Sequence, residues 1–210
     1  MPRFLIADDH AIARVGLKEI LQDAFPHAYI ETVGNAEELI KRAFEDEWDI
    51  VISDIAMPGR SGLDALNQLH KEFPKLPVLI ISVHTEDEYA LRVIKSGGAG
   101  YLNKDDAVED ELEKAVTQIL NGRKYITPSV AEMLAGEVAM DTEKLPHEKL
   151  SDREFDVFRL LAQGKSTGEI AGQLSLSVNT IGTFRSRLMT KMGIRNNAGL
   201  VAYAIAHGLV

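Results

Sequence analysis

The sequence contains, at residues 50–54, the run Ile50-Val51-Ile52-Ser53-Asp54, in which apolar residues lead through a serine to a carboxylate. Four further short segments also predict strands, and they lie at residues 4–7, 29–33, 78–81 and 99–102. Several of these segments are nearly unbroken apolar runs, as expected of strands that are covered on both faces. Amphipathic stretches separate them, and the best of these spans residues 107–121. The alternation predicts an α/β fold with a doubly wound, five-stranded parallel sheet.

Polar side chains follow four of the predicted strands. In open parallel sheets, ligands bind outside the carboxyl ends of the strands, so the residues at these ends are expected to converge. They are Asp8, Asp9, Asp54, Ser82, Asn103 and Lys104.

This set of residue types favours a metal-dependent phosphoryl site. Crowded carboxylates repel one another unless a cation joins them, and Mg²⁺ prefers oxygen ligands. Lys104 supplies a point charge for a phosphoryl group, and the Ser82 hydroxyl supplies a hydrogen-bond donor. Each residue also has an ordinary alternative: a solvated turn for the aspartate pair, a helix cap for Asp54, a surface lysine, and a serine that closes a strand. The convergence of all of them favours the site.

Residues 1–120 resemble the receiver domain of bacterial two-component response regulators. The motifs that support the resemblance are Leu5–His10, Val51–Gly59 with Gly62 after it, Ile81-Ser82 and Gly97–Lys104. The resemblance implies a flavodoxin-like fold in which Asp54 accepts phosphate from the phosphohistidine of a sensor histidine kinase.

The same resemblance implies roles for the other residues of the site. Asp8 and Asp9 would hold Mg²⁺ together with Asp54 and the backbone carbonyl of Ala56. Lys104 would pair with the phosphoryl oxygens. Ser82 and Tyr101 would form the switch pair, in which the serine is drawn toward the phosphate and the tyrosine ring turns inward.

A phosphatase that forms an aspartyl phosphate is the enzymatic alternative. Such enzymes usually have a second acid two residues after the nucleophile, and this chain has Ala56 there. The sequence therefore favours a self-limited phosphoacceptor over an enzyme that turns over substrate. His84, two residues after Ser82, is either a residue that shapes hydrolysis of the phosphate or an exposed loop histidine.

The strand pattern stops after Gly122, and the rest of the chain predicts helices. We interpret residues 1–121 as the receiver domain, 122–148 as a linker with a short helix at 129–137, and 149–210 as a separate all-α domain. The helices of that domain are predicted to begin at a capping box, Ser151 to Glu154, and to continue near the following ranges: 166–174, 178–192 and 197–207.

Charge is distributed unevenly along the chain. The formal net charge is −9. From His147 to the end, however, eight lysines and arginines stand against five acids, which leaves +3, and residues 1–146 have −12. Such asymmetry fits a C-terminal domain that binds DNA, although many other domains would also fit.

Residues 150–208 resemble the LuxR-type helix-turn-helix domain of the NarL/FixJ class of response regulators. The supporting motifs are Leu150–Glu154, Glu169-Ile170-Ala171, Ser177–Ile181 and Lys191–Ile194. The resemblance implies that phosphorylation controls binding of a homodimer to DNA. It also implies that the last helix forms the dimer through Ala198, Val201, Ala202 and Ile205; the alternative is that this apolar strip belongs to the core of the domain.

The helix predicted at 178–192 has two distinct faces. Ile181, Phe184, Leu188 and Met192 lie on one stripe and are expected to pack inward. On the other side, Asn179 and Arg187 are the best candidates to contact bases, whereas Arg185, Lys191 and Lys165 suit phosphates or local ion pairs. The complete set of candidate DNA contacts is Lys165, Asn179, Thr180, Thr183, Arg185, Ser186, Arg187 and Lys191.

This half of the chain departs from its family. Gly168, Gly182 and Asn197 stand where basic residues are common, and Phe184 and Arg187 replace a histidine and an asparagine. Fewer phosphate contacts would weaken the salt-dependent part of DNA binding. An alternative function follows, in which the receiver is coupled to a helical domain that binds a protein rather than DNA.

Composition bounds the location of the chain. It has no cysteine, which excludes disulfides and thiolate metal sites. Acids near the N-terminus argue against a signal peptide, and no apolar run reaches membrane-spanning length, so the expected location is the cytoplasm with no membrane partner.

Overall fold

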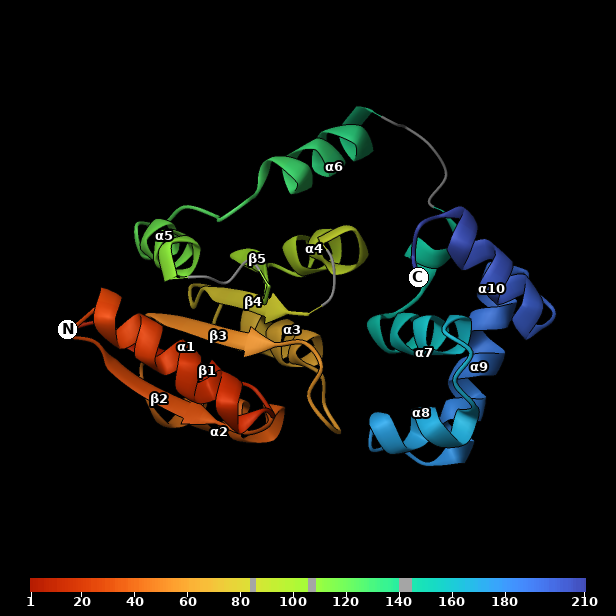
Figure 1. The fold of residues 1–210 in the computed structure, drawn as a ribbon, viewed down its shortest axis with the longest axis horizontal. Helices are drawn as coiled ribbons and strands as arrows, with labels where there is room; N and C mark the ends of the chain where they lie inside the picture. Colours follow the sequence, from red (N-terminus) through yellow and green to blue (C-terminus); the bar gives the residue numbers. More distant parts are fainter. Residues whose placement is uncertain (84–85, 106–108, 140–144) are drawn as a thin grey trace. The chain divides into compact units, whose positions relative to one another are not determined.

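The computed structural model of the chain describes residues 1–83, 86–105, 109–139 and 145–210. The backbone forms two compact units, residues 1–139 and residues 140–210. The sheet belongs to the first unit, and the second is built from helices (Figure 1). Within the described ranges, no helix combines the length and the apolar character needed to cross a membrane.

The first unit contains the predicted sheet. Its strands are β1 (Arg3–Ala7), β2 (Tyr29–Val33), β3 (Ile50–Asp54), β4 (Val78–Ser82) and β5 (Gly100–Asn103). All neighbours are parallel, in the order β2-β1-β3-β4-β5. The predicted fold class is confirmed, and every strand begins and ends within one residue of its expected position.

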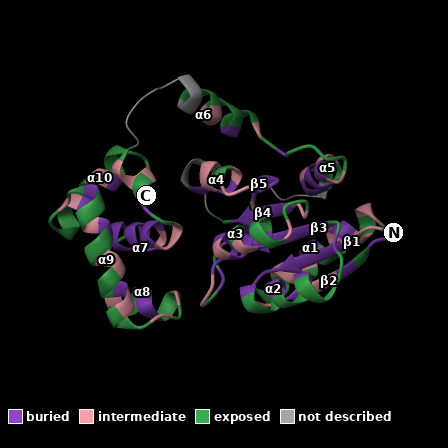
Figure 2. Ribbon diagram, turned by 180° about the vertical axis from the view of Figure 1, so that it is seen from behind, coloured by how far each residue is buried: buried purple, intermediate pink, exposed green. Residues whose placement is uncertain are grey.

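Helices cover both faces of this sheet. On one face lie α1 (Ala11–Ala24) and α5 (Glu109–Leu120), and on the other α2 (Ala36–Glu45) and α3 (Gly62–Glu72), while α4 (Glu86–Lys95) packs against β5 (Figure 1). As a result β3 and β4 are buried along their whole length (Figure 2). Burial on both sides is the reason that the first residues of both strands form an unbroken apolar run rather than an alternating pattern.

The segment after α5 stays with the first unit. The Tyr125 N–H donates to the Ala99 carbonyl at 2.8 Å, which attaches the chain beside β5. Helix α6 (Pro128–Ala139) follows, packs against α4 and buries Val130. The helix predicted at 129–137 is therefore present. The assignment of 122–148 as a functional linker stays a prediction.

The second unit is a set of short capped helices. A 3-10 turn, η1 (Pro146–Lys149), leads into α7 (Asp152–Ala162), α8 (Thr167–Gln173), α9 (Val178–Met192) and α10 (Asn197–Ala206). The predicted capping box of Ser151 and Glu154 begins α7, and a second one begins α8. Gly193 ends α9 in the left-handed conformation, with φ at 67°. Side-chain caps thus define where the four helices begin, and Gly193 defines where α9 ends.

Candidate functional site

The polar residues at the carboxyl ends of the strands meet, as predicted. Asp8 and Asp9 follow β1, Asp54 ends β3, and Lys104 follows β5. Ser82 lies beside Asn103 in the β4–β5 register, and the Lys104 N–H donates to the Ser82 carbonyl at 2.8 Å. Parallel pairing therefore brings residues from four strands to one edge of the sheet.

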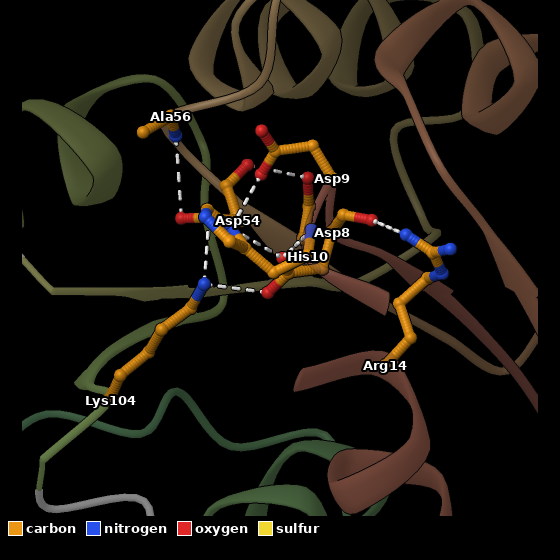
Figure 3. A network of polar contacts seen from close by, with 8 residues as sticks. Asp8, Asp9, His10, Arg14, Asp54, Ala56 and Lys104 are labelled. Atoms are coloured by element: carbon orange, nitrogen blue, oxygen red, sulfur yellow. Dashed lines mark hydrogen bonds and ion pairs between the residues drawn. The ribbon is translucent and has the colours of Figure 1, made fainter. Parts of the chain in front are cut away.

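Lys104 joins two carboxylates that are the most buried ones among the described residues of the first unit. Its Nζ lies 2.6 Å from Asp8 Oδ2 and 2.8 Å from Asp54 Oδ2 (Figure 3). Asp8 is 0% exposed and Asp54 is 3% exposed, so the ammonium compensates charges that water cannot reach. The Ala56 N–H donates to the other oxygen of Asp54 at 3.3 Å.

Burial tunes the reactivity of Asp54. Desolvation raises the pKa of its carboxyl above 3.8, Lys104 opposes that rise, and the charge of Asp8 adds to it. For Lys104, burial lowers the pKa, but Asp54 and Asp8 outweigh that effect and raise it overall, which keeps the lysine cationic. A carboxylate with a raised pKa is more basic and hence a better nucleophile, while the lysine beside it can accept the negative charge of a transferred group.

Asp9 completes a cluster whose chemistry fits a divalent cation. The side chains of Asp8, Asp9, His10 and Asp54 can each offer one ligand atom, and these atoms lie within 4.8 Å of one another. Asp9 Oδ1 is buried, and among the described residues no donor reaches it with hydrogen-bonding geometry. A buried carboxylate oxygen in this position is a natural ligand for a cation.

The sequence analysis assigned no role in the site to three residues that the structure places there. The ring of His10 contacts the aspartates, Arg14 Nη1 donates to the Asp8 carbonyl at 2.5 Å, and Gly62 lies directly under Asp54. A Cβ at position 62 would lie 1.8 Å from the Asp54 carbonyl oxygen, so only glycine fits there. The position of His10 directly after Asp8 and Asp9 could have indicated its contact with them. No local sequence pattern indicated the contact of Arg14.

The proposed switch residues are both buried. Ser82 is 0% exposed and Tyr101 is 2% exposed, so the tyrosine ring already lies inside the fold. Residue 84, the histidine considered for hydrolysis of the phosphate, lies outside the described residues.

The outer face of α9 is open, as its amphipathic pattern predicted. Ile181, Leu188 and Met192 are buried, while Phe184 is only half-buried. A groove of about 670 Å³ runs along the exposed side and is lined by Thr167, Val178, Asn179, Gly182, Thr183, Ser186 and Arg187. The candidate base contacts thus share one surface.

Most basic candidates are paired inside the second unit. Arg185 donates to Asn197 Oδ1 at 3.0 and 3.2 Å, Lys191 Nζ lies 2.6 Å from Glu154 Oε2, and Lys165 Nζ lies 2.5 Å from Gln173 Oε1. Hydroxyls are also engaged locally: Thr183 donates to the Asn179 carbonyl, and Thr180 contacts Ser177. Arg187 is exposed and, within the part of the chain that the structure describes, makes no hydrogen bond or ion pair.

The apolar strip on α10 faces solvent rather than the core of its unit. Ala198, Ala202 and Ile205 are exposed and Val201 is half-buried, whereas Leu200 and Ala204 supply the packing. Of the two alternatives for this strip, burial inside the domain is therefore wrong.

Two family models match the chain. "Response regulator receiver domain" matches residues 4–117, more than half of the sequence, and "Bacterial regulatory proteins, luxR family" matches residues 148–204. The chain is a response regulator. The family named from the sequence is thus confirmed, with the cluster of Asp8, Asp9, Asp54 and Lys104 in the first match and the open helix α9 in the second.

Known response regulators are similar over the full length of the chain. Response regulator UvrY of Escherichia coli K12 is 32% identical over 213 residues, which cover 100% of this chain and 96% of that protein. Response regulator GacA of Pseudomonas aeruginosa is 32% identical over 214 residues, with 100% and 98% covered. Among solved structures, two RcsB dimers bound to two parallel DNAs match at 26% identity with a TM-score of 0.59, covering 98% of each chain.

Proposed function

We propose that this response regulator is a transcription regulator whose binding to DNA is controlled by phosphorylation of Asp54. The central observation is the position of Asp54, buried at the end of β3 between Lys104 and the Asp8–Asp9 pair. Asp8 shares the contact with Lys104, but among the described carboxylates only Asp54 is itself the last residue of a strand and also accepts the Ala56 N–H.

The chemistry of the receiver is a transfer of phosphate to a carboxylate. An oxygen of Asp54 attacks the phosphorus of a sensor kinase's phosphohistidine, and the bond from phosphorus to the imidazole nitrogen breaks. Asp8, Asp9, Asp54 and the carbonyl of Ala56 would hold Mg²⁺, which neutralises the charge of the phosphoryl group. Lys104 then exchanges its contact with Asp54 for one with the phosphoryl oxygens.

The product is an acyl phosphate that adds roughly two negative charges at the edge of the sheet. Ser82 has a hydroxyl at the neighbouring strand end and donates to that phosphate, and Tyr101 moves with it. These two residues bias the population of active molecules rather than create a new state, so some DNA binding occurs without phosphate. Because Ala56 offers no second acid, the site acts as a phosphoacceptor and not as a phosphatase with turnover.

The DNA is bound by α9, and the dimer forms through α10. Asn179 and Arg187 contact bases, and Arg185, Lys191 and Lys165 contact phosphates. Thr180, Thr183 and Ser186 on α9 complete the set of DNA contacts. The exposed strip Ala198, Val201, Ala202 and Ile205 supports a homodimer, and RcsB, a similar protein, is known as dimers bound to DNA. Such a regulator works in the cytoplasm, where DNA and kinase domains meet, with 1–121 as receiver, 122–148 as linker and 149–210 as DNA-binding domain.

Selection of binding sites from sheared genomic DNA tests the proposal. The protein is used with and without Mg²⁺ plus beryllofluoride, a mimic of the phosphoryl group, and Asp54→Asn serves as the control that cannot respond. Enrichment of a short inverted repeat that increases with the mimic in the wild type alone is the expected result. Absence of enrichment from folded protein would favour the alternative in which the helical domain binds a protein, and binding that does not weaken with salt would do the same.

A further inference from the structure

The side chain of His10 lies at the rim of the carboxylate cluster. Its Nδ1 is 2.8 Å from Asp9 Oδ1 and 3.4 Å from Asp8 Oδ1 (Figure 3). The backbone fixes this position, because the His10 N–H donates to Asp8 Oδ1 at 2.8 Å where α1 begins. The ring therefore faces the acids as a consequence of the fold, although 71% of its side chain is exposed.

These distances match the spacing of ligand atoms around one metal ion. With bonds of about 2.1 Å in an octahedral shell, neighbouring ligand atoms lie about 3.0 Å apart and opposite ones about 4.2 Å apart. The distances from His10 Nδ1 to Asp9 Oδ1 and Asp8 Oδ1, 2.8 and 3.4 Å, lie close to the spacing expected of neighbouring ligand atoms. One ligand atom of His10 and one from each of Asp8, Asp9 and Asp54 also lie within 4.8 Å of one another, which places the ring nitrogen among the carboxylate oxygens like a neighbouring ligand.

Lys104 leaves this side of the cluster available. It contacts Oδ2 of Asp8 and Oδ2 of Asp54, whereas His10 lies near Oδ1 of Asp8. The lysine and the histidine thus approach the carboxylates through different oxygens. A cation can occupy the His10 side while the lysine remains in place.

We propose that His10 is a nitrogen ligand that makes this site bind a divalent transition metal, such as Ni²⁺ or Co²⁺, more tightly than Mg²⁺. The inference rests on the proposed cation site of Asp8, Asp9 and Asp54. Imidazole suits Ni²⁺, Co²⁺ and Zn²⁺, while Mg²⁺ takes oxygen ligands almost exclusively. A transition metal would compete for the same carboxylates, so the phosphoacceptor site would respond to the metal supply as well as to the kinase.

Calorimetric titration of the full chain with NiCl₂ and with MgCl₂ tests this role. The variants are His10→Gln, which removes the imidazole from an exposed side chain, and His27→Gln, which removes an exposed imidazole beyond the end of α1. We expect His10→Gln to weaken Ni²⁺ binding by about 10-fold or more, while Mg²⁺ binding changes by less than about twofold. His27→Gln should change neither, and Ni²⁺ should displace Mg²⁺ from the wild type.

Equal Ni²⁺ affinity in the wild type and His10→Gln would overturn the inference, as would failure of Ni²⁺ to displace Mg²⁺. Neither result touches the proposed phosphorylation. That proposal is tested separately by formation of the Mg²⁺–beryllofluoride complex on the same proteins, which requires the aspartates and not the histidine. An Asp9→Asn variant should lose affinity for both Ni²⁺ and Mg²⁺, which would show that the two metals bind at the same site.

Discussion

The ammonium nitrogen of Lys104 lies 2.8 Å from Asp54 Oδ2, although the two residues are 50 positions apart in the chain. The contact exists because β3 and β5 both flank β4, so that their carboxyl ends come within reach of one lysine side chain. It places a fixed cation beside the carboxylate proposed to receive phosphate.

Lys104→Ala should slow phosphorylation of Asp54. Removal of a preorganised charge from a reacting centre typically costs about 100-fold or more in rate. The measurement is the rate of phosphoprotein formation from a small-molecule phosphodonor with Mg²⁺. Lys114→Ala is the matched control, because that lysine is exposed and, among the described residues, pairs with Glu111 of the same helix, α5. A rate for Lys104→Ala equal to that of the control would contradict the role of Lys104.

Asp54→Asn should change how the stability of the receiver depends on pH. Burial raises the pKa of the Asp54 carboxyl above 3.8. Between the unfolded and the folded pKa the native state holds the proton more tightly, so this group's contribution to stability decreases as the pH rises. Asparagine does not titrate. The gain in unfolding free energy from Asp54→Asn should therefore be larger near about pH 7 than near about pH 4.

Urea unfolding measures this effect when it is followed by tryptophan fluorescence. Trp48 is the only tryptophan in the sequence and lies in the first unit, so the signal reports the unfolding of that part of the chain. Asp23→Asn removes an exposed carboxylate of α1 and serves as the comparison. The prediction is contradicted if Asp54→Asn and Asp23→Asn alter the free energy of unfolding by the same amount at both pH values.

Gly182→Ala should stabilise the second unit. A Cβ at this position meets nothing within 4 Å, and glycine within a helix costs about 0.5–1 kcal/mol relative to alanine. The expected increase in the free energy of unfolding of that unit is thus about 0.5–1 kcal/mol. Scanning calorimetry resolves it, and a decrease would mean that the glycine has a packing role.

Gly182→Lys should strengthen DNA binding. The added cation would lie in the groove of α9 and reach one phosphate, which steepens the logarithmic salt dependence by about 0.9. Anisotropy titrations over a range of salt concentrations measure that slope. Gly136→Lys places the same charge on α6, where a Cβ also meets nothing. If the two substitutions have equal effects, the result reflects net charge and not the DNA-binding face.

Ile205→Asp should separate dimerisation from DNA recognition. Ile205 is 66% exposed within the apolar strip of α10, so a carboxylate there spares the core but opposes pairing of two such strips. Loss of the second subunit should weaken binding to an inverted repeat by about 100-fold and leave binding to a single half-site unchanged. Ile12→Asp alters a similarly exposed residue of α1 and should have no effect. Equal losses on both DNAs would refute the role of the strip.

The sequence by itself determined the fold and the main members of the site. Apolar runs of strand length, polar residues at their ends and serine caps followed three residues later by glutamate are local patterns, and parallel pairing converts them into predictable positions. Asp8, Asp9, Asp54, Ser82 and Lys104 therefore meet where the sequence placed them. The departure Gly182 was also visible, because a glycine within a helix is unusual without any structure.

Only the tertiary structure decided which partner each side chain takes. Lys104 joins Asp8 to Asp54, Arg185 donates to Asn197, and Lys191 pairs with Glu154 in a different helix. The tertiary structure also placed the ring of His10 against the aspartates. It showed that the apolar strip of α10 faces solvent, whereas the sequence allowed either the core of the domain or a dimer interface. The contacts of Lys104 and Lys191 join residues far apart in the chain, and the ring of His10 could have turned away from its neighbours. Both depend on distances of a few ångströms, and local patterns contain no information at that scale.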